Sequence, residues 1–265
     1  MINNKPIGIF DSGLGGLTVL KTLLKELPNE SFIFFGDTAH VPYGNKSKET
    51  IKIFSNAIIK FLLKHSVKMI VVACNTVSAV ALSDIQKTIN IPIIGVISPL
   101  KSYLKFQPQH KKIGIIGTEN TINSKAYSKV IHDYNSKIKI YSLACPLFVP
   151  IIEEGLENHR IAYILTEKYL QPLVNKKLDL LILGCTHYPI IQKTIKSIMP
   201  NKTIIIDSAT ITAIEVKKYI NNNNLYSRNK KQKIQAYVSD KPKQFQKNSA
   251  KFLGNQILDV QKVDI

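Results

Sequence analysis

The stretch KMIVVACNT at residues 68–76 has an imperfect copy in DLLILGCTH at residues 179–187. Each stretch is a run of aliphatic residues followed by a small residue, a cysteine and a polar neighbour. This pattern is typical of a buried parallel strand that delivers a side chain at its carboxyl end. Open α/β sheets bind their ligands at that end. The two stretches therefore predict an α/β fold in which Cys74 and Cys185, two of only three cysteines, serve one site.

Short apolar segments alternate with segments of helical periodicity in the first hundred residues. We expect strands over 5–10, 31–35, 67–72 and 91–96, and helices over 14–27, 46–64 and 77–87. In the second helix, Ile51, Phe54 and Ile58 fall on one face. Alternation of this kind predicts a mostly parallel sheet with helices on its faces.

The pattern then restarts. KIGIIGT at 112–118 echoes PIGIFDS at 6–12, and the offset of 106 residues between Ile7 and Ile113 is close to the 111 between the cysteines. This predicts two similar α/β lobes related by a pseudo-twofold axis, with the site in the cleft between them. We expect a first lobe from 1–97 plus 208–265, which regains a strand at 233–238 and a helix at 242–253, and a second lobe from 98–207.

Composition limits the possible partners. The 265 residues carry a formal net charge of +18, but all except two of the 36 basic residues are lysines, and they are scattered. This favours a solvated surface over a nucleic-acid site, whose basic residues normally cluster on one face. No apolar run approaches the ~20 residues of a bilayer span, and the apolar stretch in residues 1–10 is too short for a signal-peptide h-region, so we expect no signal peptide there. With an odd number of cysteines, we expect free thiols and a cytoplasmic protein without a membrane partner, in which Cys145 is a buried apolar residue.

The glycine-rich stretch DSGLGGL at 11–17 invites a nucleotide-binding interpretation, because it follows a strand and opens a helix. It matches neither Gly-x-Gly-x-x-Gly nor a P-loop, and Asp11 would repel phosphate. We predict instead a tight turn that presents Asp11 and Ser12 and donates N–H groups to a carboxylate. No Cys and His spacing typical of a metal site is present, so we expect neither a cofactor nor a metal.

Five motifs occur in order between residues 7 and 190. They are GIFDSGLGG (8–16), PYG (42–44), ACNT (73–76), PLFVP (146–150) leading to EEG (153–155), and GCTHYP (184–189). Together they resemble glutamate racemases of the aspartate/glutamate racemase superfamily. The resemblance implies a cofactor-independent isomerase that supplies D-glutamate for bacterial peptidoglycan.

The chemistry of racemisation suits the two cysteines. The α-proton leaves one face of the amino acid and a proton returns to the other face, so two opposed acid/base groups are needed. A helix N-terminus or a nearby histidine lowers the pKa of a thiol towards neutral pH. Both cysteines precede expected helices, whose dipoles favour thiolates. We therefore expect Cys74 and Cys185 to be the two bases.

Supporting roles follow from position and from the resemblance. Asp11 is placed to assist Cys74 and His187 to assist Cys185, and the second copy has Gly117 where the first has Asp11. The resemblance implies that Cys74 acts on D-glutamate and Cys185 on L-glutamate, and adds Asp37 and Glu153 as secondary catalytic candidates. The implied substrate contacts are Asp11, Ser12, Tyr43, Gly44, Asn75, Thr76, Thr186 and His187.

Alternatives stay open at this stage. A sibling racemase acting on aspartate has the same two-thiol design, although aspartate racemases commonly carry an acidic residue where His187 stands. A basic nucleic-acid-binding protein on a racemase fold would have no reason to keep both thiols and His187. Asp37 has a simpler interpretation as the cap of a turn, and Glu153 as part of a solvated helix start. We expect glutamate as the small-molecule partner and a homodimer as the assembly.

Overall fold

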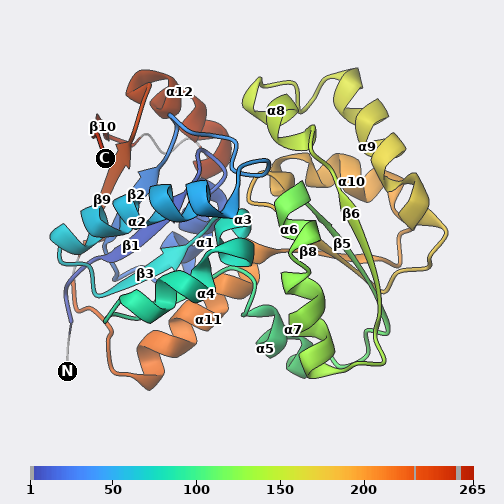
Figure 1. Cartoon of the computed structure of the whole chain (residues 1–265), viewed down its shortest axis with the longest axis horizontal. Coiled ribbons are helices and arrows are strands. Elements are labelled where there is room, and N and C mark those ends of the chain that lie inside the picture. The colour runs from blue at the N-terminus through green and yellow to red at the C-terminus, as the bar shows by residue number, and fades with distance from the viewer. Residues whose placement is uncertain (1–2, 230, 255–257) are drawn as a thin grey trace.

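Two parallel sheets, one in each lobe, organise the computed structural model, which describes residues 3–229, 231–254 and 258–265 (Figure 1). Within these residues the first sheet has the strand order β10-β9-β2-β1-β3-β4 and the second has the order β6-β5-β7-β8. Every pairing is parallel. The strands are β1 Ile7–Asp11, β2 Phe32–Gly36, β3 Met69–Val72, β4 Ile93–Gly95, β5 Lys112–Gly117, β6 Lys139–Ala144, β7 Leu180–Gly184, β8 Ile204–Asp207, β9 Ile234–Val238 and β10 Val260–Lys262.

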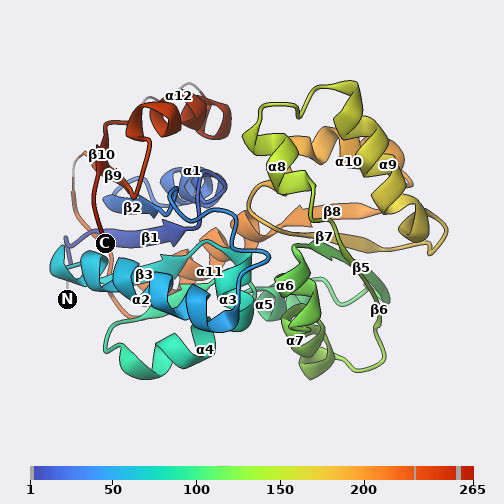
Figure 2. The same ribbon diagram turned by 45° about the horizontal axis from the view of Figure 1, so that its top comes forward.

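Helices connect the strands and cover both faces of each sheet (Figure 2). The first lobe contains α1 Leu17–Glu26, α2 Lys48–Lys64, α3 Asn75–Val80, α4 Leu82–Ile85, the 3-10 turn η1 Gln86–Thr88, α11 Ser208–Asn222 and α12 Pro242–Leu253. The second lobe contains α5 Leu100–Phe106, α6 Glu119–Asn123, α7 Ala126–Tyr134, α8 Phe148–Glu153, α9 Arg160–Val174, the 3-10 turn η2 Tyr188–Ile191 and α10 Gln192–Ile198.

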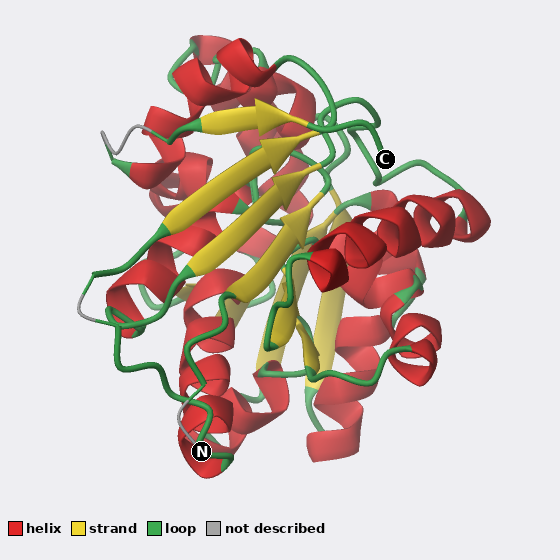
Figure 3. Cartoon of the chain, turned by 90° about the vertical axis from the view of Figure 1, so that its left-hand side faces the viewer, coloured by secondary structure: helices red, strands yellow, loops and turns green. Residues whose placement is uncertain are grey.

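The central strands are buried on both faces. Every residue of β1, β2, β3 and β7 is buried, which is why these strands read as continuous aliphatic runs rather than alternating ones. In Figure 3 the strands of the first sheet point the same way between layers of helix. Their carboxyl ends therefore gather along one edge, where polar side chains meet.

The internal repeat in the sequence corresponds to a repeat in the sheets. The order β2-β1-β3-β4 recurs as β6-β5-β7-β8, so the segments 6–12 and 112–118 are the central strands of their lobes. Cys74 follows β3, and Cys185 follows β7, the matching strand. The expected α/β architecture of two mostly parallel sheets flanked by helices is confirmed. The changes of sheet fall between β4 and β5 and between β8 and β9.

Local details differ from the sequence-based expectations. The helix expected over 77–87 is divided into α3, α4 and η1. Ser78 explains part of the division, because its hydroxyl donates to the Val72 carbonyl and accepts from the Val96 N–H, both at 3.2 Å, which ties α3 to the sheet. The helix expected from residue 14 begins at Leu17, since the glycines before it wrap around Asp11. Strand β10 was not expected, because three residues are too few to show a pattern.

Candidate active site

Both cysteines line one small pocket between the lobes. It lies at the carboxyl ends of β1 and β3 in the first sheet and of β5 and β7 in the second, the edge at which open α/β sheets bind ligands. Cys74 is 4% exposed and Cys185 is 6% exposed, so both thiols are buried. The lining residues are Ser12, Val41, Pro42, Tyr43, Gly44, Cys74, Asn75, Thr76, Thr118, Val149, Cys185, Thr186 and His187.

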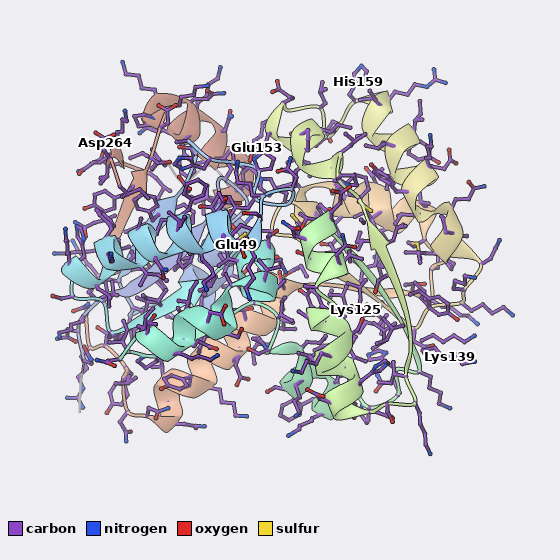
Figure 4. The ribbon with its side chains drawn as sticks, viewed as in Figure 1. Glu49, Lys125, Lys139, Glu153, His159 and Asp264 are labelled. Atoms are coloured by element: carbon purple, nitrogen blue, oxygen red, sulfur yellow. The ribbon has the colours of Figure 1, made fainter. Side chains whose placement is uncertain are left out.

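A histidine and a glutamate support the Cys185 thiol. His187 Nδ1 lies 3.9 Å from Cys185 Sγ, and its Nε2 lies 2.6 Å from Glu153 Oε1. Glu153 comes from α8 and lies where the lobes meet beside α12 (Figure 4). Burial opposes a charge on His187, but the contacts with Cys185 and Glu153 outweigh it and raise the pKa of His187 well above its usual range. The raised pKa favours a positive charge on the His187 ring beside Cys185 Sγ.

His187, rather than the N-terminus of an α-helix, is the group that lies beside the Cys185 thiol. No α-helix starts at Cys185: the 3-10 turn η2 begins at Tyr188, and α10 begins only at Gln192. Cys185 precedes η2 and α10, as expected, but the chain first makes the turn in which Tyr188 N–H donates to the Cys185 carbonyl at 3.2 Å, so no α-helix N-terminus lies at the thiol.

The surroundings of Cys74 are different. Its thiol donates to Ser12 Oγ at 3.8 Å, and Cys74 caps the N-terminus of α3. Burial and then the Asp11 carboxylate raise the pKa of Cys74 to about 12. The N–H of Val77 in the first turn of α3 lowers this pKa, in the direction expected from a helix N-terminus, but loss of hydration and a like charge outweigh it.

Asp11 is fully buried behind the pocket lining at the end of β1. Its Oδ2 accepts from Gly13 N–H at 3.2 Å and from Gly16 N–H at 2.8 Å, as expected for a tight turn. Burial raises the pKa of Asp11, and the nearby charge of His187 opposes this. Oδ1 is buried without a hydrogen-bond partner among the described residues. An unpaired buried acceptor of this kind suits an ammonium group.

Asp37 lies outside the pocket lining, behind Tyr43. Its carboxylate accepts from the Tyr43 hydroxyl, from Ser239 Oγ at 2.6 Å and from His40 Nδ1 at 2.8 Å. These bonds anchor the Tyr43 ring in the pocket wall. The geometry therefore indicates a positioning role for Asp37, which was expected only as a secondary catalytic candidate.

Polar side chains bridge the lobes on the Cys74 side. Asn75 Nδ2 donates to the Tyr127 hydroxyl at 2.8 Å, and the hydroxyls of Thr76 and Thr118 lie 3.0 Å apart. A Cβ added to Gly44 would lie 2.8 Å from Thr118 Cβ, so only glycine fits there without displacement. The structure thus brings the expected contacts of the 42–44 and 73–76 motifs against the second lobe.

The glycine-rich loop closes the opposite side. Thr18 Oγ1 donates to the carbonyls of Gly15 at 2.8 Å and Thr186 at 3.1 Å. A Cβ added to Gly15 would lie 2.3 Å from Thr186 Oγ1 and 2.4 Å from His187 Nδ1. The loop after β1 is therefore packed directly against the residues that follow Cys185.

Sequence reasoning did not name four of the pocket residues as site residues, namely Val41, Pro42, Thr118 and Val149, although Pro42 and Val149 lie within the quoted motifs. Thr118 had a usable signal, because it stands in the second copy where Ser12 stands in the first. The two valines carry no chemical signal, and only the assembled pocket shows their place.

Known proteins share this sequence and this fold. A family model described as Asp/Glu/Hydantoin racemase matches residues 7–216. The chain belongs to this racemase family. It is 43% identical over 262 residues to a glutamate racemase from Geobacter metallireducens, covering 98% of this chain and 97% of that protein.

Solved racemase structures match over the whole chain. A glutamate racemase isoform from Bacillus anthracis superposes with a TM-score of 0.95 at 36% identity, covering 99% of this chain and 98% of that one. A glutamate racemase from Francisella tularensis, solved in complex with D-glutamate, superposes with a TM-score of 0.92 at 40% identity, covering 98% of each chain. The racemase fold expected from the motifs is therefore confirmed.

The described part of the chain holds neither a cluster of metal ligands nor a helix that could span a membrane. Within residues 3–229, 231–254 and 258–265, no group of three His, Cys, Asp or Glu side chains is placed to hold a metal ion. In the same part of the chain, no helix combines the length and the apolar character needed to cross a bilayer.

Proposed function

We propose that the protein interconverts L- and D-glutamate without a cofactor, through two opposed thiols, and supplies D-glutamate for peptidoglycan synthesis. One observation carries the proposal: Cys74 and Cys185, delivered by matching strands of two similar lobes, line the same buried pocket. Membership of a racemase family whose full-length relatives are glutamate racemases supports it.

In the L-to-D direction, the Cys185 thiolate takes the α-proton and the Cys74 thiol gives its proton to the opposite face of the α-carbon. The result is a Cys185 thiol and a Cys74 thiolate, and the reverse reaction restores the starting state. The His187–Glu153 pair stabilises the Cys185 thiolate by charge at 3.9 Å. This assignment of faces follows the family resemblance, and the two environments of the thiols are consistent with it.

The positive charge of the substrate ammonium group favours a thiolate at Cys74. The substrate ammonium pairs with the unpartnered Oδ1 of Asp11, which neutralises the carboxylate that raises the pKa of Cys74. The hydroxyls and amide of Ser12, Asn75, Thr76 and Thr186 surround the same space and suit the two carboxylates. Thiolate formation at Cys74 is therefore coupled to substrate binding.

The test is direct. Purified protein, dialysed against EDTA, is incubated with L-glutamate, D-glutamate or L-aspartate, and circular dichroism follows the optical activity. We expect both glutamate enantiomers to reach the same racemic end point and aspartate to remain unchanged. A requirement for an added cofactor or metal would contradict the mechanism, and preferential racemisation of aspartate would favour the sibling activity.

Three further properties are proposed from the sequence. We propose a cytoplasmic homodimer, for which light scattering should give about twice the chain mass of 29.8 kDa. The lysines form a solvated surface, so a fluorescence titration with duplex DNA should show no salt-dependent specific binding. A monomer by light scattering would contradict the homodimer, and tight binding to DNA would contradict the solvated lysine surface.

A further inference from the structure

The reaction pocket is too small for glutamate as it stands, with about 20 Å³ of free space, and most of its lining is buried, although Pro42 is exposed. Tyr43 is 1% exposed, Cys74 4% and His187 2%. A molecule of the size of glutamate reaches the thiols only if part of the wall moves. The part of the pocket wall that can move most easily therefore marks the route by which the substrate enters.

A second, open hollow adjoins this wall. It has a volume of about 130 Å³ and lies between the loops that follow β1 and β2, the end of α8, and the N-terminal half of α12. Figures 1 and 2 show α12 beside the first sheet, facing α8 across the junction of the lobes. Its lining residues are Gly13, Leu14, Thr38, Val41, Glu153, Lys241, Gln244, Phe245 and Asn248.

Two side chains separate the hollow from the pocket. Val41 lines both spaces. A Cβ added to Gly13 would lie 3.3 Å from Val41 Cγ2 and 3.5 Å from Glu153 Oε1, so these two side chains converge over Gly13 from opposite lobes. Val41 is partly exposed on a loop, and Glu153 is 24% exposed at the end of a short helix. Neither side chain is packed in a hydrophobic core, so a movement of the loop, or of one lobe relative to the other, separates Val41 from Glu153.

The rim of the hollow carries positive charge where an anionic substrate arrives. Lys241 is exposed and stands at the N-cap of α12 in a left-handed conformation with φ of 49°. No side chain caps this helix, so the N–H groups of its first turn add to the positive potential. Glu153 and Asp240 are the opposing charges nearby. The arrangement attracts carboxylates to the rim and places the one anion of the wall, Glu153, against His187.

We propose that this hollow is the entrance through which glutamate reaches the thiols, that Val41 and Glu153 form its gate, and that Lys241 draws in the substrate carboxylates. The proposal rests on the proposed function only for the identity of the substrate. Because Glu153 also holds His187 at 2.6 Å, opening the gate loosens the group that supports Cys185. The proton relay on the Cys185 side is thus complete only when the gate is closed.

The first test measures access without relying on turnover. Iodoacetate and iodoacetamide alkylate thiols and differ in charge, and mass spectrometry of peptides gives the rate at Cys74 and Cys185. At low ionic strength, Lys241→Glu should slow alkylation by iodoacetate about 5-fold and leave the neutral iodoacetamide within about 1.5-fold. The matched control is Lys247→Glu, since Lys247 is exposed on the same helix but does not line the hollow. Equal effects of the two variants would overturn the role of Lys241.

The second test blocks the hollow. Asn248→Trp places an indole in it without touching the lining of the reaction pocket, and Lys247→Trp is the control. We expect Asn248→Trp to slow both reagents and to lower kcat/KM for glutamate about 10-fold, with an unchanged circular dichroism spectrum. Alkylation and turnover at the rate of the wild type would overturn the entrance. Slowed alkylation in a protein that does not racemise glutamate would support the entrance and contradict the proposed function.

Discussion

At the scale of single residues, the two thiols face one pocket in opposite electrostatic surroundings. Cys185 Sγ has the His187 ring at 3.9 Å, and Glu153 holds that ring. Cys74 has a hydroxyl partner, Ser12, and the charge of the Asp11 carboxylate. The Cys185 side has a histidine and a glutamate of the protein beside its thiol, whereas the Cys74 side faces a carboxylate that a substrate cation can pair with. The two cysteines therefore have different tasks.

Replacing each cysteine by serine should separate these tasks. Cys74→Ser and Cys185→Ser should each lower racemisation by about 10³-fold or more, because one face loses its acid/base group. With a glutamate analogue that carries a leaving group at Cβ, removal of the α-proton alone causes elimination. Cys74→Ser should then eliminate from the L-analogue through Cys185, and Cys185→Ser from the D-analogue through Cys74.

The histidine provides the control for this assignment. His187→Asn should depress elimination from the L-analogue more than from the D-analogue, because His187 contacts only Cys185 of the two thiols. Product formation followed by absorbance gives both rates. Equal elimination from both enantiomers by both serine variants would contradict the assignment of faces.

Most site residues were predictable from sequence, and their electrostatics were not. The duplicated strand ends identified Cys74 and Cys185, and adjacency identified His187. The raised pKa of Cys74 arises from burial and from Asp11, which lies 63 positions away in the chain. Asp37 reads like a pocket residue but lies behind Tyr43. Loss of hydration and the distances between segments are set by the folded pocket, so the sequence pattern alone does not predict them.

A buried histidine away from the site makes the fold sensitive to acid. His110 is 2% exposed, its ring stacks 6.1 Å from that of Tyr103, and neither ring nitrogen has a hydrogen-bond partner among the described residues. Burial lowers the pKa of His110, and the charge of Asp179 only partly offsets this. The folded state thus binds fewer protons than the unfolded state, whose histidine titrates near about 6.5. This contribution to stability is intact above that pH and is lost as the pH falls through it.

Urea unfolding at pH 7.5 and 5.5 measures the effect. His110→Phe, which keeps an aromatic ring beside Tyr103, should remove about 1 kcal/mol of the acid-induced loss of stability. The control is His132→Gln on the exposed face of α7, which should leave the pH dependence unchanged. An identical pH dependence in the wild type and His110→Phe would show that this histidine is not responsible.

At the scale of elements, the loop between β1 and α1 joins the lobes at the reaction site. Its glycines allow the backbone to approach Asp11 on one side and the residues after β7 on the other. Sequence reasoning predicted the turn and the presentation of Asp11 and Ser12. The contact with the second lobe was not predictable, because it depends on how the sheets face each other. Likewise, helical periodicity over 77–87 did not reveal the break at Ala81, which the bonds of Ser78 to the sheet impose.

Gly15→Ala should disrupt this junction. The new Cβ would lie 2.3 Å from Thr186 Oγ1 and 2.4 Å from His187 Nδ1, so it would displace His187 from Cys185. We expect kcat to fall about 100-fold or more, the scale of a lost acid/base partner. The control is Gly8→Ala on β1, where the nearest atom is Leu62 Cδ1 at 3.2 Å and the pocket is untouched. Its kcat should stay within about twofold of the wild type, and a similar kcat for Gly15→Ala would contradict the account of the loop.

At the scale of the whole molecule, one buried ion pair holds the segment at residues 225–227, where the chain comes back to the first lobe. Lys68 Nζ is buried and lies 2.5 Å from Glu30 Oε2, 2.9 Å from the Asn3 carbonyl and 2.7 Å from the Leu225 carbonyl. Glu30 Oε1 also accepts from the Ser227 N–H at 2.8 Å. Four segments far apart in sequence therefore share one charge cluster at the amino ends of the strands, opposite the site.

Lys68→Met should be strongly destabilising, because it leaves Glu30 buried without its partner. We expect a loss of about 3–5 kcal/mol in the free energy of unfolding, measured by urea denaturation at pH 7. The matched control is Lys217→Met, which removes an exposed ion pair with Glu26 and should cost less than about 1 kcal/mol. Equal losses in the two variants would contradict the importance of the cluster.

The two-lobe architecture was the most predictable property of the chain, because the strand segments of the two lobes have similar sequences. We propose that 1–97 plus 208–265 and 98–207 form separate cooperative units, which hydrogen exchange would detect as two groups of opening free energies. A single group would contradict this division. Strand β10 and the order of strands in each sheet were not accessible from local pattern, since both depend on contacts between distant segments.

The central claim is that two different thiols handle the two faces of one substrate. The most direct measurement is racemisation of L-glutamate in D₂O, stopped after a few per cent conversion and analysed by mass spectrometry of the separated enantiomers. We predict that the D-glutamate formed carries deuterium at the α-carbon, because Cys74 delivers a solvent-derived deuteron, while the remaining L-glutamate keeps its α-proton. Deuterium in the remaining L-glutamate at this stage, or the original proton in the D-glutamate formed, would indicate a single base and contradict the account.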